Sequence, residues 1–119
     1  MDLDGVIAAL TALSHKGRLT VFRLLIKAGK GGLSAGAIAR ETEFVPQTLS
    51  GYLNSLVQSG LAFSRRESRS IIYTVNFDRM ADMLSYLLED CCDGRPEICR
   101  PLLDSFSNIT GCSKPASCQ

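Results

Sequence analysis

The sequence predicts a mainly α-helical protein with one small β-hairpin, and three observations support this fold class. Apolar residues recur at helical spacing through most of the chain up to Gly60. After Gly60 the pattern changes to two short strand-like runs, and helical spacing returns at residue 77. The chain has 119 residues, 45% of them hydrophobic, which suffices for one compact domain with a core but not for two.

Two helices are expected at the start of the chain. Residues 3–14 place five apolar residues on one stripe: Leu3, Val6, Ile7, Leu10 and Leu13. This helix either covers the core or forms a face for a dimer. Residues 17–28 form the second helix, whose predicted buried residues are Leu19, Phe22, Leu25 and Ile26, with Arg18, Arg23 and Lys27 outside. The only histidine, His15, is expected to close or cap the first helix.

A helix-turn-helix is predicted after the glycines at 29, 31 and 32, which break the chain. Ser34 suits the N-cap of a short helix, Ala35–Thr42, which Ile38 anchors in the core. Glu43–Val45 is a tight turn. Pro46 then suits the first turn of the next helix, because its missing N–H is not needed there, and Gly60 lies where that helix is expected to end.

The second of these helices, within Phe44–Leu61, has an unusual outer face. Its inner face carries Leu49, Leu53, Leu56 and Val57, and its outer face carries the short residues Gln47, Ser50, Gly51 and Asn54. No charged residue occurs from Pro46 to Leu61. A slim polar face is what a helix needs to reach base edges in a DNA groove. Taken alone, the stretch is explained equally well by an ordinary amphipathic helix.

A basic hairpin is predicted next. Leu61–Ser64 and Ile71–Val75 are short strand-like runs, and the segment between them contains Arg65, Arg66 and Arg69. These arginines suit phosphate or minor-groove contact, which supplies affinity rather than sequence reading. The alternative is a solvated hairpin tip. Its position directly after a helix-turn-helix favours a DNA-binding wing.

The last helix is expected over residues 77–91, with an apolar stripe of Phe77, Met80, Ala81, Leu84, Leu87 and Leu88. Because little of the small core is left for it, we expect the first and last helices to form a homodimer interface. A dimer presents two recognition helices to half-sites about one DNA turn apart. The prediction is a winged helix-turn-helix: a DNA-binding and dimerisation domain over residues 1–92 and a partly flexible, cysteine-containing extension over 93–119.

Charge is distributed unevenly along the chain. Residues 5–76 hold nine Lys/Arg against three Glu, a net +6, whereas residues 77–119 hold four Lys/Arg against seven Asp/Glu, a net −3. A basic body suits phosphate binding. No apolar run is long enough to span a membrane and the N-terminus lacks a signal-peptide pattern, so we expect a cytoplasmic protein with no membrane partner.

All five cysteines lie in the last 29 residues: Cys91, Cys92, Cys99, Cys112 and Cys118. A disulfide framework would spread them through the chain, and cytoplasmic thiols are kept reduced. The cluster therefore indicates metal ligands or a redox sensor. Three thiols without histidine select a soft ion, and Gly94 and Pro96 are expected to end the helix so that Cys91, Cys92 and Cys99 can converge. Cys112 and Cys118 are expected to be inessential.

Three segments together resemble the ArsR/SmtB family of metal-responsive winged-helix repressors, over roughly residues 5–90: ALSHKGRLTVFRLL, PQTLSGYLNSLVQSGL and RRESRSIIYTV. The resemblance implies a homodimer that represses resistance operons and leaves DNA when metal binds. Some features depart from the family. LSAGAIARE has no cysteine pair of the best-known arsenic-sensor type, the histidine ligands of the zinc sensors are missing, and Ser68 replaces the glycine common at the wing tip, which is expected to loosen that turn.

The segment from Cys91 to Cys99 resembles a subgroup of arsenic repressors with three thiolates at the end of the dimerisation helix. The sequence therefore predicts an arsenite-responsive repressor, not an enzyme. As(III) or Sb(III) is its effector, bound by Cys91, Cys92 and Cys99, and there is no catalytic cofactor. The predicted contacts to double-stranded operator DNA are Gln47, Thr48, Ser50, Gly51, Tyr52 and Asn54, with Arg65, Arg66 and Arg69 on phosphate.

Other functions are compatible with parts of the same sequence. A thiol redox switch, or a repressor responding to Cd(II) or Pb(II), fits the same fold. A small thiol enzyme such as an arsenate reductase is disfavoured, because no phosphate-binding loop and no nearby general base accompany the thiols.

Overall fold

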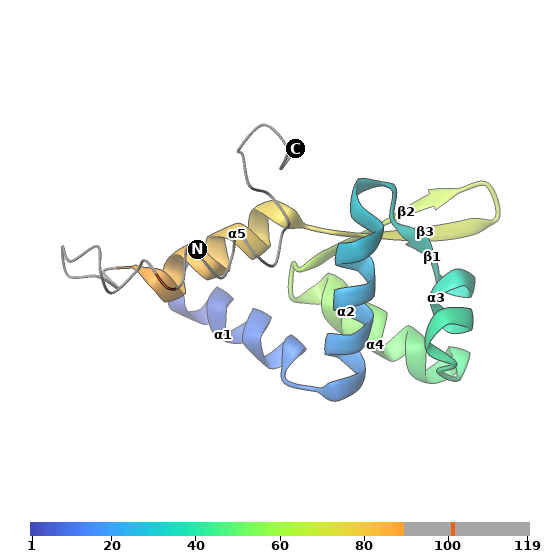
Figure 1. Ribbon diagram of the computed structural model, residues 1–119, viewed down its shortest axis with the longest axis horizontal. Coiled ribbons are helices and arrows are strands. Elements are labelled where there is room, and N and C mark those ends of the chain that lie inside the picture. Colours follow the sequence, from blue (N-terminus) through green and yellow to red (C-terminus); the bar gives the residue numbers. More distant parts are fainter. Residues whose placement is uncertain (90–100, 102–119) are drawn as a thin grey trace. The chain divides into compact units, whose positions relative to one another are not determined.

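The computed structural model describes residues 1–89 and residue 101, and its elements follow the predicted order (Figure 1). They are α1 (Leu3–Leu13), α2 (Lys16–Ala28), the 3₁₀ turn η1 (Gly29–Gly31), β1 (Leu33–Ser34), α3 (Ala35–Thr42), α4 (Pro46–Gln58), β2 (Ala62–Glu67), β3 (Ser70–Val75) and α5 (Phe77–Leu88). Met1–Tyr86 forms one compact unit, and a second unit begins at Leu87. The predicted winged helix-turn-helix is confirmed. None of the helices described is long and apolar enough to cross a membrane.

The described sheet has three antiparallel strands in the order β1-β3-β2. The sequence predicted only the β2–β3 pair, since two residues are too few for β1 to show an alternating pattern. Leu33 of β1 pairs with Tyr73 of β3. Gly32, just before β1, has φ +71°, and a side chain there would overlap the backbone oxygen of Tyr73. The chain therefore needs glycine at this point to bring β1 against β3.

The hairpin is longer than predicted. Arg65 and Arg66 were expected in a loop but belong to β2, and pairing continues to Glu67 and Ser70. Exposed polar strands of this kind lack the apolar alternation that reveals a strand in sequence. The expectation of a looser turn at Ser68 was wrong: Ser68 takes a left-handed conformation, φ +56°, within a tight turn.

The core is built mainly from α1, α2 and α4, with Ile38 as the buried residue of α3. Its largest fully buried side chains are Val21, Leu25, Ile38, Leu49, Leu53, Leu56 and Leu61. Five of these were predicted to face inward on their helices, whereas Val21 was missed and Leu19, predicted buried, is 41% exposed. Ile26 is half-buried. The buried leucines of α4 fix which of its faces is turned outward.

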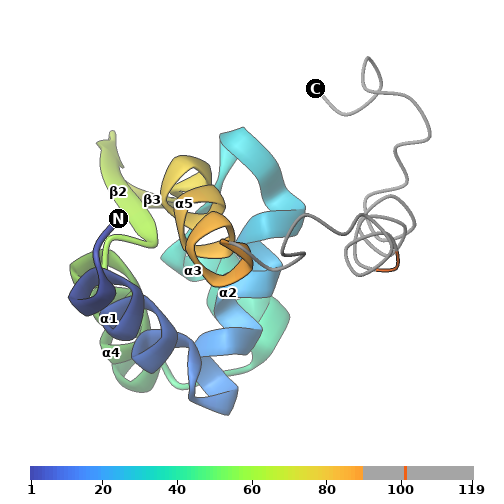
Figure 2. The same cartoon turned by 90° about the vertical axis from the view of Figure 1, so that its left-hand side faces the viewer.

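The apolar stripe predicted for α1 is divided between the core and the outer side of the helix, with Val6 and Leu13 on the inward side. Val6, Ala9 and Ala12 face the core, whereas Leu3, Ile7 and Leu10 are 57%, 51% and 39% exposed. Small alanine side chains let α1 pack closely alongside α2 and α4, which leaves the larger residues outside (Figures 1 and 2). On α5, Met83 is buried, although it was not on the predicted stripe, and Leu84 and Leu87 are exposed. The remaining residues predicted for that helix, 90–91, lie outside the described residues.

Polar caps set where the helices begin. Asp2 Oδ1 accepts a hydrogen bond from Gly5 N at 2.8 Å, and Ser34 Oγ accepts one from Ala37 N at 3.1 Å, as predicted for Ser34. His15 was expected to close or cap the first helix. Instead its Nδ1 accepts from Gly17 N at 3.0 Å and caps α2.

Asn76 joins three elements at the base of the hairpin. Its Oδ1 accepts from Arg79 N at 3.1 Å, which caps α5. Its Nδ2 donates to Gly60 O at 3.0 Å, and its backbone N–H donates to Leu61 O at 2.8 Å. The exit of α4, the base of the wing and the start of α5 are therefore held at one residue.

We expect Asn76→Ala to lower the free energy of unfolding by about 2 kcal/mol, because a helix cap and a side-chain hydrogen bond are both lost. Asn76→Asp keeps a capping oxygen but cannot donate to Gly60 O, so it should lose about 1 kcal/mol. Urea unfolding at one fixed protein concentration measures both variants. An alanine variant as stable as the wild type would contradict the role assigned to Asn76.

Candidate nucleic-acid interface

The turn between α3 and α4 sets the angle at which α4 is presented. Glu43 follows α3 in a left-handed conformation, φ +61°, and its N–H donates to Ala39 O at 2.8 Å. Thr42 Oγ1 donates to Ile38 O at 2.8 Å and accepts from Phe44 N at 3.3 Å. Pro46 then opens α4. The predicted tight turn Glu43–Val45 is thus fixed by local hydrogen bonds.

The two faces of α4 are as different as the sequence indicated. Leu49, Leu53 and Leu56 are buried, and Val57 is half-buried. The exposed residues of α4 include five of the predicted DNA contacts: Gln47, Thr48, Ser50, Gly51 and Asn54. A side chain added at Gly51 would meet nothing within 4 Å. The outer face of α4 is therefore uncharged and slim, and no packing inside the described chain requires glycine at position 51.

Tyr52, predicted at the edge of the groove, is half-buried. Its ring centroid lies 5.1 Å from that of His15 and 5.5 Å from that of Phe44. A side chain at Gly17 would fall on the Tyr52 ring, so glycine in α2 makes room for it. Tyr52 thus anchors α4 against the start of α2, and its contact with DNA stays a prediction.

The three wing arginines are exposed but not equivalent. Arg65 Nη2 donates to Gly31 O at 3.2 Å and lies 3.6 Å from Glu67 Oε2. Arg66 follows Arg65 in β2, so its side chain points to the opposite face of the hairpin. Arg69 lies in the turn. Within residues 1–89, Arg66 and Arg69 make no hydrogen bond or ion pair with another side chain, which leaves them available for phosphate.

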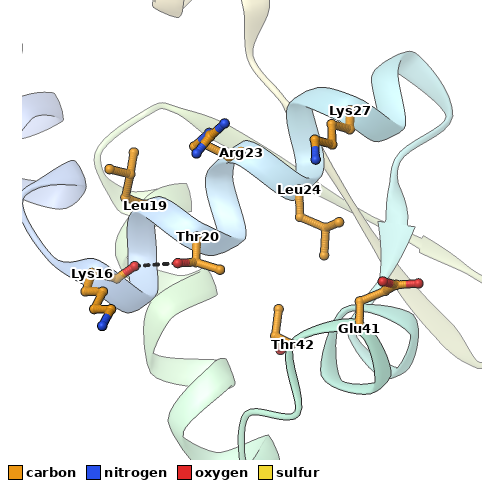
Figure 3. Close-up of a pocket in the computed structure, with 8 residues that line it drawn as sticks. All are labelled: Lys16, Leu19, Thr20, Arg23, Leu24, Lys27, Glu41 and Thr42. Carbon is orange, nitrogen blue, oxygen red and sulfur yellow. Dashed lines mark hydrogen bonds between the residues drawn. The ribbon is translucent and has the colours of Figure 1, made fainter.

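A hollow of about 490 Å³ lies between α2 and α3 (Figure 3). Its charged lining consists of Lys16, Arg23 and Lys27 from α2 and Glu41 from α3. Thr20 Oγ1 in its wall donates to Lys16 O at 2.8 Å. None of the residues that line this hollow belongs to α4.

The predicted metal ligands Cys91, Cys92 and Cys99 lie outside the described residues, as do Cys112 and Cys118. In the part of the chain that the structure describes, no group of three or more His, Cys, Asp or Glu residues could hold a metal ion. All cysteine sulfurs follow Glu89 in the sequence. A thiolate site, if the protein has one, therefore belongs to the C-terminal segment.

No protein-family model and no curated protein matches the sequence. Solved structures do match it. A possible transcriptional regulatory protein from Mycobacterium bovis is 30% identical, with a TM-score of 0.59 over 74% of this chain and 94% of that chain. A homodimeric winged helix-turn-helix DNA-binding domain from the same organism, a possible ArsR-family transcriptional regulator, is 29% identical, with a TM-score of 0.60 over 78% and 82%. The transcriptional repressor BigR from Xylella fastidiosa is 28% identical, with a TM-score of 0.58 over 71% and 84%.

If the wing holds phosphate, we expect Arg66→Ala and Arg69→Ala each to reduce the steepness with which DNA affinity falls with salt. Each lost phosphate contact lowers the slope of log K against log salt by about 0.9 per protomer. Arg23→Ala is the matched control, because it removes an exposed arginine from α2. Binding measured from 50 to 300 mM salt, a range chosen to span roughly the physiological value, gives these slopes. An equal reduction in the Arg23 variant would contradict the assignment to the wing.

Proposed function

Because the chain belongs to the ArsR family of winged-helix transcriptional regulators, we propose that it is a repressor that binds operator DNA as a homodimer and dissociates when As(III) or Sb(III) binds. The exposed, uncharged face of α4 is the observation that carries this proposal. α4 is the second helix of a helix-turn-helix, and this face of it points outward. The basic wing, β2 and β3, follows α4 in the chain. We also propose that the protein is located in the cytoplasm, where a repressor meets its operator DNA.

Sequence reading is assigned to the outer face of α4. The amide side chains of Gln47 and Asn54 can each donate and accept, which suits the paired acceptor and donor edges of a base in the major groove. Ser50 and Thr48 add hydroxyl groups, and Gly51 lets the helix backbone come close. The wing arginines supply affinity that does not depend on sequence.

The homodimer is supported by the apolar residues left exposed on α1 and α5. Leu3, Ile7 and Leu10 form the outer side of α1, and Leu84 is exposed on α5. Both helices were predicted to form the interface. Burial of such residues against a second copy is favourable by about 25 cal/mol per Å² of apolar surface. The homodimeric M. bovis domain has the same fold.

The effector assignment rests on the chemistry of the cysteines. Cys91 follows the last residue of α5, Leu88, by three positions, and Cys92 and Cys99 follow within eight more. Three thiolates suit a soft, thiophilic ion such as As(III) or Sb(III). Effector binding to the segment that follows α5 in sequence would favour an arrangement of the dimer in which the two α4 helices no longer match the half-sites. A coupling of a few kcal/mol between the two sites is sufficient.

The proposal is tested by fluorescence anisotropy of reduced protein on DNA from upstream of its own gene. Arsenite, cadmium and peroxide are titrated in parallel. Release by arsenite alone is the expected result. Release by cadmium would assign a different metal, and release by peroxide that reductant reverses would indicate that two thiols are oxidised to a disulfide as peroxide is reduced to water. Absence of DNA binding at modest salt would overturn the repressor function itself.

Substitution of single cysteines locates the effector site. Cys91→Ser, Cys92→Ser and Cys99→Ser should each leave DNA affinity unchanged and abolish release by arsenite, because each removes one of three thiolates. The matched control is the double variant Cys112→Ser/Cys118→Ser, which should respond like the wild type. If a variant lacking Cys91, Cys92 and Cys99 were still released by arsenite, the site assignment would be wrong.

A further inference from the structure

Val45 is the most exposed of the large apolar residues in the described part of the chain, at 63%. It is the N-cap residue of α4 and lies two positions before Gln47. Single exposed apolar residues are common on protein surfaces and need no explanation. The position of Val45, however, is one where an apolar residue is unfavourable.

Helix N-caps favour side chains with an oxygen that can accept a hydrogen bond from the first turn, and valine has none. Four other α-helices of the described chain, α1, α2, α3 and α5, begin with a side chain that accepts a hydrogen bond from a backbone N–H: Asp2, His15, Ser34 and Asn76. Val45 makes no side-chain capping bond. Local helix stability therefore does not explain valine here, and its side chain is not buried in the core.

The location of Val45 suggests what it contacts. Recognition helices read base edges in the major groove mainly with their N-terminal residues. The apolar group on those edges is the C5-methyl of thymine, which apolar side chains contact. The β-branched side chain of valine is stiff, so little rotamer freedom is lost when it is held against a methyl group.

We infer that Val45 contacts a thymine methyl in each operator half-site and makes the protein prefer thymine at that position. This inference rests on the proposed DNA-binding function and adds a specificity-determining residue to it. It also explains why the exposed start of α4 carries an apolar side chain rather than a capping hydroxyl.

The test replaces each thymine of the operator in turn with deoxyuridine, which lacks only the methyl group. Wild-type protein should lose about fourfold in affinity per half-site at one position, the effect of one buried methyl-sized group. Val45→Ser should bind the thymine operator more weakly by a similar factor and should no longer distinguish thymine from deoxyuridine there. Because serine can cap α4, the melting temperature of this variant should not fall.

Leu19→Ser is the matched control, since it removes another exposed aliphatic side chain from a different helix, α2. It should keep the full sensitivity to deoxyuridine. DNA binding by the wild type without sensitivity at any position would overturn the inference and leave the proposed function intact. Sensitivity that persists unchanged in Val45→Ser would overturn it too, and would assign the methyl contact to another residue. If the wild type bound no DNA, the proposed function and the inference would both fail.

Discussion

The arrangement of the DNA-reading elements depends on the hydrogen bonds of Asn76. One side chain caps α5 and donates to Gly60 O at the exit of α4, while the backbone of the same residue bonds to Leu61 at the base of the wing. A change in the position or orientation of α5 would therefore act, through Asn76, on the end of α4 and on the base of the hairpin. This gives the proposed effector site, a few residues beyond α5 in sequence, a physical connection to DNA binding.

Stability and recognition are separated on α4. Leu49, Leu53 and Leu56 supply the buried face, and Tyr52 is held by His15, Phe44 and the space that Gly17 leaves. The outer face contributes almost nothing to packing, as the open space around Gly51 shows. Its residues can therefore be explained by contact with a partner. Glycine within a helix is unfavourable by about 1 kcal/mol relative to alanine, so its presence there needs such an explanation.

The sequence predicted the features that depend on local chemistry. Ser34 predicted the start of α3, Pro46 predicted the start of α4, and the leucine spacing predicted the buried face of α4. The structure confirms all three. Features that depend on distant residues were missed or misjudged. β1 exists because it pairs with β3, and the inward face of α1 was decided by close packing of Ala9 and Ala12 rather than by its larger residues. Asn76 joins its neighbours by hydrogen bonds to both Gly60 and Arg79, and Gly60 is distant in sequence. The cysteine site lies outside the described residues and stays a prediction.

The most direct test of the account is a paired measurement on Gly51→Leu, of its unfolding free energy and its affinity for operator DNA. Leucine favours the helix and has open space to occupy, so stability should rise by about 1 kcal/mol. The same side chain would hold α4 away from the base edges, so operator affinity should fall at least tenfold, about 1.4 kcal/mol. A variant that is more stable and still binds its operator as tightly as the wild type would show that this face of α4 does not enter the groove.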